Sequence, residues 1–120
     1  TNLHALESAL RSQTRPVILI AGGKQKGSDY RPLTSLLAQK AKAMISFGEI
    51  GEELRSIFAT TVQCQKVETL EEAVAMAAVM AERGETILFS PGTSSFDQFN
   101  GYEERGRAFK AALPQMIKTL

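Results

Sequence analysis

Four short runs of residues alternate with stretches of helical periodicity, and this alternation constrains the fold more than any other feature. The runs cover residues 16–21, 43–47, 62–67 and 86–89. Each is too short for a buried helix, and the first is rich in β-branched residues, so we predict strands. The run at 62–67 is more polar and is expected nearer the edge of the sheet. Strands separated by helices favour right-handed crossovers and a parallel sheet. The expected fold is therefore α/β, a Rossmann-like three-layer sandwich with a mostly parallel sheet, in a single domain over residues 1–120.

The helical stretches are recognised by apolar residues that recur on one side. Five such stripes are predicted: Leu3, Leu6 and Leu10; Leu33, Leu36 and Leu37 behind Pro32; Ile50, Leu54, Ile57 and Phe58; Leu70, Ala73, Val74, Ala77, Ala78 and Ala81; and Phe109, Ala112, Leu113, Met116, Ile117 and Leu120. Thr69 and Glu72 have the spacing of a capping box at the start of the fourth helix. Gly84 is expected to end that helix, and Pro114 to kink or shorten the last one.

Composition excludes several classes of protein. The formal net charge of +1 shows no footprint for nucleic acid or a membrane surface, and no apolar run reaches the ~20 residues of a membrane span. A single cysteine rules out an internal disulfide and a thiolate zinc site, which fits a reducing compartment. Because the chain begins at Thr1 without a methionine, we expect it to be a fragment of a longer protein.

Two loops are the candidate functional segments. Residues 22–29 follow the first predicted strand and contain three glycines and two lysines, while residues 90–106 follow the strand at 86–89 and are rich in serine, threonine and glycine. In an α/β sheet, loops at the carboxyl ends of strands bind ligands through backbone N–H groups and helix amino ends. Both loops therefore suit a small anion, although the first could equally be a flexible surface turn.

The usual catalytic motifs are missing. Lys26 precedes Gly27, so the first loop is not a phosphate-binding P-loop, and no dinucleotide fingerprint occurs. The single histidine, His4, lies on the first helix, which makes a serine–histidine–acid arrangement with Ser94 or Ser95 improbable. Cys64 is expected to be a small hydrophobe, and no group has metal-ligand spacing.

The same two loops carry a resemblance to a known family. Residues 90–99 read Ser-Pro-Gly-Thr-Ser-Ser-Phe-Asp-Gln-Phe, residues 102–106 read Tyr-Glu-Glu-Arg-Gly, and residues 22–30 contain Gly-Gly-x-x-Lys-Gly-x-Asp-Tyr. This pattern resembles the carboxy-terminal domain of the D-glutamate ligases of the Mur ligase family. The resemblance extends over essentially the whole chain in matching order.

The resemblance implies one domain of a three-domain cytoplasmic enzyme of peptidoglycan synthesis. Such an enzyme joins D-glutamate to UDP-N-acetylmuramoyl-L-alanine through an acyl phosphate. ATP and Mg²⁺ would be bound mainly by a central domain outside this chain. The carboxy-terminal domain would bring D-glutamate and close over the site, which excludes water. The isolated domain is expected to be inactive, and no nucleic-acid or membrane partner is implied.

Residue roles also follow from the resemblance. Lys26 corresponds to a lysine that faces the reaction centre. Five residues fall where the family holds the two carboxylates of D-glutamate: Ser28, Arg55, Ser95, Phe96 and Tyr102. Charge-assisted hydrogen bonds from separated donors suit a dicarboxylate. The alternative interpretation of Arg55 is an ordinary surface arginine. One difference is that the family often has an aspartate, associated with the nucleotide, where this chain has Lys24 and Gln25.

The sequence leaves three alternatives open. The chain could be the equivalent domain of another Mur ligase or of a folylpolyglutamate ligase, which use other amino acids. It could be a receiver-like signalling module, although that needs an acidic cluster where the first strand is followed by Gly22, Gly23 and Lys24. It could also be a generic nucleotide-binding module, which the absent fingerprint disfavours.

Overall fold

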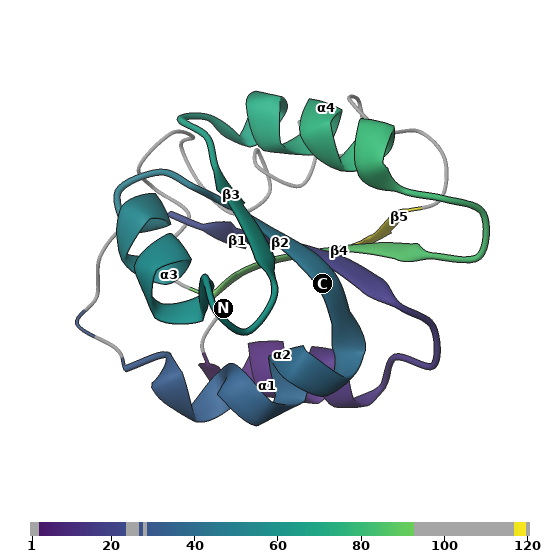
Figure 1. Ribbon diagram of the computed structural model, residues 1–120, viewed down its shortest axis with the longest axis horizontal. Coiled ribbons are helices and arrows are strands. Elements are labelled where there is room, and N and C mark those ends of the chain that lie inside the picture. Colours follow the sequence, from purple (N-terminus) through teal and green to yellow (C-terminus); the bar gives the residue numbers. More distant parts are fainter. Residues whose placement is uncertain (1–2, 24–26, 28, 93–116, 120) are drawn as a thin grey trace.

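The protein is a three-layer α/β sandwich. The computed structural model describes residues 3–23, 27, 29–92 and 117–119. Its elements follow one another as α1 (Leu3–Arg11), β1 (Val17–Gly22), the 3₁₀ helix η1 (Arg31–Leu33), α2 (Thr34–Lys40), β2 (Ala41–Phe47), α3 (Gly51–Phe58), β3 (Gln63–Lys66), α4 (Leu70–Met80), β4 (Thr86–Gly92) and β5 (Ile117–Thr119). Figure 1 shows α4 on one side of the sheet and α1, α2 and α3 on the other.

The five strands form one sheet in the order β3-β2-β1-β4-β5. Each of the four neighbouring pairs is parallel, which confirms the predicted fold class. Among the helices of the described residues, none is long and apolar enough to cross a membrane.

The central strand β1 is buried on both sides because each face supplies its own core. Val17, Leu19 and Ala21 pack with α1, α2 and α3, whereas Ile18 and Ile20 pack against α4. Successive side chains of a strand point to opposite faces, so an uninterrupted apolar run can fill two layers at once. The apolar run seen in the sequence is therefore the middle of the sandwich.

The polar strand β3 lies at the edge of the sheet, as its composition predicted. Among the strands that the structure describes, it pairs only with β2, and three of its four side chains are exposed. Ser46 of β2 is fully buried and donates a hydrogen bond from Oγ to the carbonyl oxygen of Gly51 at 2.7 Å. Because Gly51 begins α3, this bond fixes the first turn of α3 against the inner strand.

The end of α4 differs from the prediction. Gly84 does not end this helix, because α4 stops at Met80 and Ala81 is already extended. Gly84 instead has φ of 89° inside a turn that the Glu85 N–H closes onto the Glu82 carbonyl. Ala78, expected on the buried stripe, is exposed.

The carboxyl-terminal prediction is corrected in part. Residues 117–119, expected at the end of the last helix, form the strand β5, which pairs in parallel with β4 through Ile87 and Ile117. The strand at 86–89 is therefore not the last one. The spacing of the apolar residues Met116, Ile117 and Leu120 in the sequence is compatible with a helix or a strand. The pairing of residues 117–119 with β4 makes this segment a strand. The rest of that predicted helix lies outside the described residues.

The capping box at the start of α4 is confirmed. The Thr69 hydroxyl accepts a hydrogen bond from the Glu72 N–H at 3.1 Å, and the Glu72 carboxylate accepts from the Thr69 N–H at 3.1 Å. The two bonds satisfy backbone donors that a helix leaves unpaired at its amino end.

We predict that Thr69→Ala lowers the free energy of unfolding of the chain by about 1 kcal/mol, because the Glu72 N–H loses its acceptor. Urea denaturation followed by circular dichroism measures this change. Thr60→Ala is the matched control, since Thr60 is exposed in a turn. Equal stability of both variants would contradict the role of the cap.

Candidate functional site

The order of the strands places the candidate site at the carboxyl edge of β1 and β4. The chain proceeds from β1 to β2 and β3 on one side, then crosses to β4 on the other side of β1. Connections that leave neighbouring parallel strands in opposite directions open a crevice where α/β proteins bind ligands. Gly22 and Gly92 are paired in the ladder, so the two loops begin side by side at this edge.

Two glycines fix the start of the first loop. A side chain at Gly22 would overlap the carbonyl oxygen of Phe47, so only glycine fits here. Gly23 has φ of 120°, donates its N–H to the Phe47 carbonyl at 3.2 Å, and accepts from the Ile50 N–H at 3.1 Å. The loop is thereby tied both to the end of β2 and to the start of α3.

The far end of the same loop is anchored by Tyr30. Its side chain is buried in the core on the α1–α3 side, and burial, with a smaller contribution from Glu53, raises the pKa of its phenol to about 12. The neighbouring Asp29 carboxylate accepts hydrogen bonds from the backbone N–H, Nε and Nη2 of Arg31. These bonds from Arg31 hold the pKa of the Asp29 carboxyl below its usual value. Both ends of the loop are fixed.

We predict that Gly22→Ala destabilises the chain more than Gly27→Ala does. The first variant forces a methyl group into the backbone of Phe47, which costs about 1–3 kcal/mol or more. The second meets no atom within 4 Å and pays only for φ of 75°, about 1 kcal/mol.

Chemical denaturation of the two variants measures this difference. The reverse order of stability would show that Gly22 does not determine where the loop starts.

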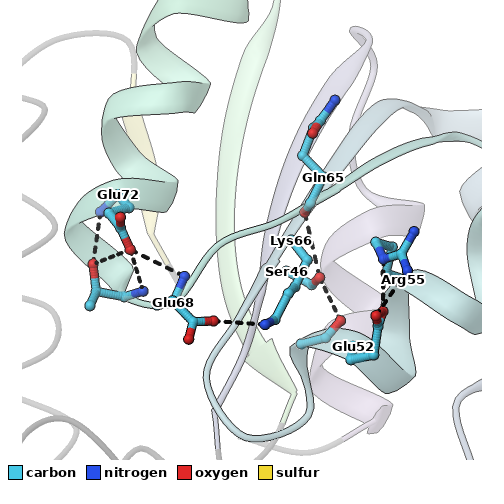
Figure 2. A network of polar contacts seen from close by, with 9 residues as sticks. Ser46, Glu52, Arg55, Gln65, Lys66, Glu68 and Glu72 are labelled. Carbon is cyan, nitrogen blue, oxygen red and sulfur yellow. Dashed lines mark hydrogen bonds and ion pairs between the residues drawn. The ribbon is translucent and has the colours of Figure 1, made fainter.

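Arg55, the one predicted site residue that is described, carries an ion pair within α3. Its Nε and Nη2 donate to the two carboxylate oxygens of Glu52 at 2.7 and 2.8 Å, and both side chains are about half exposed. Figure 2 shows this pair beside β3. Hydrogen bonds from Arg55 lower the pKa of the Glu52 carboxyl. The pairing matches the interpretation of Arg55 as a surface arginine and leaves its predicted role untested.

Charged residues continue along the carboxyl edge from α3 to α4. Lys66, the last residue of β3, donates from Nζ to the Glu68 carboxylate at 2.7 Å, and the Glu68 N–H donates to the capping residue Glu72 (Figure 2). Sequence reasoning did not single out Glu52 or Lys66. The i,i+3 spacing of Glu52 and Arg55 was a usable signal, whereas only the fold brings Lys66 to this edge.

The remaining predicted site residues, Lys26, Ser28, Ser95, Phe96 and Tyr102, lie outside the described residues. The structure brings together the two strand ends from which their loops depart. It does not test the role of any of these side chains.

His4 and Cys64, to which the sequence assigned no catalytic role, lie in the elements where they were predicted. His4 is an exposed residue of α1, and Cys64 is half-buried in β3. Burial raises the pKa of the Cys64 thiol, although Arg55 partly opposes this, so one basic neighbour is present that the sequence did not indicate. Within the part of the chain that is described, no three His, Cys, Asp or Glu residues are grouped to hold a metal ion.

A cavity of about 360 Å³ lies at the opposite edge of the sheet. It is lined by residues that precede and begin β1 and β2: Gln13, Thr14, Arg15, Pro16, Gln39, Lys40, Ala41 and Lys42. Much of its polar lining is already engaged, since Lys40 donates to the Gln13 carbonyl and Lys42 pairs with Glu82 and Glu85. The strand order favours the other edge as the functional one.

The fold is an α/β domain of the doubly wound kind, in which the ends of β1 and β4 are neighbours where the strand order reverses. The sequence model of the family described as "Mur ligase, glutamate ligase domain" matches residues 1–93. The chain belongs to this family.

Relatives with high identity carry one name, UDP-N-acetylmuramoylalanine--D-glutamate ligase. The protein of Chlorobium phaeobacteroides strain DSM 266 is 44% identical over 110 residues, which are 92% of this chain and 24% of the relative. The protein of Chlorobium chlorochromatii is 44% identical over 117 residues, which are 98% of this chain and 25% of the relative. The protein of Geotalea daltonii is 42% identical over 113 residues, which are 94% of this chain and 25% of the relative. The chain thus spans about a quarter of the length of these relatives.

Proposed function

We propose that this chain is the D-glutamate-binding domain of a cytoplasmic ligase that adds D-glutamate to UDP-N-acetylmuramoyl-L-alanine in peptidoglycan synthesis. The reaction would pass through an acyl phosphate, which the amine of D-glutamate attacks. The domain would hold D-glutamate between its two loops and close the active site against water.

The observation that carries the proposal is the adjacent departure of the two loops. Gly22 and Gly92 are neighbours at the reversal of the strand order, which is where α/β domains bind ligands. The family match and the names of the relatives support a ligase and D-glutamate as the amino acid.

Each residue has a proposed part in holding the amino acid. Ser95, Phe96 and Tyr102 would grip one carboxylate of D-glutamate, and Ser28 and Arg55 the other. Lys26 would face the acyl phosphate and stabilise the negative charge that develops there. Because Gly23 and Tyr30 are anchored, the loop between them would present Lys26 and Ser28 from two fixed ends.

ATP and Mg²⁺ would be held by the other domains of the enzyme. The described residues contain no grouping of acidic, histidine or cysteine side chains suited to a metal ion. ATP would supply the phosphoryl group that activates the carboxylate of the UDP substrate.

We predict that Lys26→Ala lowers kcat of the full-length enzyme by about 100-fold or more, because a cation aimed at developing charge is lost. Lys24→Ala removes an equal charge from the same loop and should change kcat less than threefold. Release of phosphate that depends on D-glutamate measures both. Equal effects of the two variants would refute the assignment of Lys26.

Two further assays separate the proposal from its rivals. The isolated chain should show no ATP hydrolysis with the UDP substrate and D-glutamate; steady turnover would refute its role as a binding domain only. The full-length enzyme should use D-glutamate in preference to L-amino acids. A preference for an L-amino acid would point to another Mur or folylpolyglutamate ligase.

A further inference from the structure

Glu52 and Arg55 of α3 and Lys66 of β3 lie where these two elements adjoin the candidate edge. The Glu52 carboxylate is held by Nε and Nη2 of Arg55 through a two-point contact at 2.7 and 2.8 Å. Hydrogen bonds from Arg55 lower the pKa of the Glu52 carboxyl, and the positive charge of Lys66 lowers it further to a smaller extent. An arginine that makes a two-point contact with a carboxylate, with a lysine on the neighbouring element, also suits the carboxylate of a ligand.

Lys66 reaches this position because its stem crosses the first turn of α3. A side chain at Gly51 would come within 3.3 Å of Lys66 Cγ and 3.7 Å of Lys66 Cε, so the lysine lies directly over the residue before Glu52. The buried Ser46 fixes the same turn by its bond to the Gly51 carbonyl. The Lys66 ammonium itself donates to the exposed Glu68 carboxylate at 2.7 Å, so a ligand would compete with Glu68 for it.

We infer that Arg55 and Lys66 form a carboxylate subsite that Glu52 occupies when no substrate is bound, and that one carboxylate of D-glutamate displaces Glu52 from it. The inference rests on the proposed function and adds Lys66 and Glu52 to it. Glu52 is then an internal competitor of the substrate, and Lys66 is a substrate-binding residue.

Three observations favour displacement over a permanent pair. Glu52 and Arg55 are both about half exposed, and exposed ion pairs between residues three apart are weak. The Glu52 side chain can rotate into solvent without uncovering the core, because it is exposed on α3. The pair also lies at the carboxyl end of β2 and β3, on the same edge as the two loops.

The test is Glu52→Gln in the full-length enzyme, which keeps the size of the side chain and removes its charge. We expect KM for D-glutamate to fall about two- to fivefold with kcat unchanged, the gain available when an exposed ion pair no longer competes. Lys66→Met should raise KM for D-glutamate. Glu71→Gln, an equal charge change in the first turn of α4, is the control and should leave KM unchanged.

The decrease in KM for D-glutamate caused by Glu52→Gln must also depend on Arg55. In an Arg55→Met background, which should itself raise KM for D-glutamate, Glu52→Gln should no longer lower it. A purely structural role of Glu52 would instead lower the unfolding midpoint and leave KM unchanged or raised, and that result would overturn the inference.

The outcomes distinguish this inference from the proposed function. If Arg55→Met raises KM while Glu52→Gln or Lys66→Met has no effect, the subsite is wrong and the proposed function stands. If D-glutamate is not a substrate of the full-length enzyme, the proposed function itself fails.

Discussion

The contact between Gly22–Gly23 and the end of β2 is the constraint on which the candidate site depends. The backbone of Gly22 lies so close to the Phe47 carbonyl that no side chain is tolerated, and Gly23 bonds to both Phe47 and Ile50. The first loop must therefore leave the sheet at one place and in one direction. Because Gly22 also pairs with Gly92, the same contact sets where the second loop begins.

The charges near this edge are arranged in short, local pairs. Asp29 with Arg31, Glu52 with Arg55, and Lys66 with Glu68 each join residues two or three apart. Such pairs contribute little to the stability of the fold because water competes for both partners. At the proposed binding edge, such pairs would hold cations near the surface and leave them available to an incoming carboxylate.

The sequence predicted the sandwich well because its signals were local. The apolar run at 16–21, the polar edge at 62–67 and the capping box at Thr69 each depend on residues close in the chain. The prediction failed at residues 117–119, whose conformation is decided by pairing with β4, a partner about thirty residues earlier. The prediction for Gly84 was also wrong, because its positive φ belongs to a turn beyond the helix and not to the end of the helix. Lys66 was missed because only the packing of β3 on α3 brings its side chain beside Gly51, the residue before Glu52.

The central claim is that the loops after β1 and β4 together hold D-glutamate at one edge of the sheet. Hydrogen exchange of the full-length enzyme, with the UDP substrate and a non-hydrolysable ATP analogue present, tests it most directly. Addition of D-glutamate should slow exchange in both segments, residues 22–30 and residues 90–102, and leave the opposite edge at residues 13–16 and 39–42 unchanged. Protection in only one of the two loops, or at the opposite edge instead, would contradict the account.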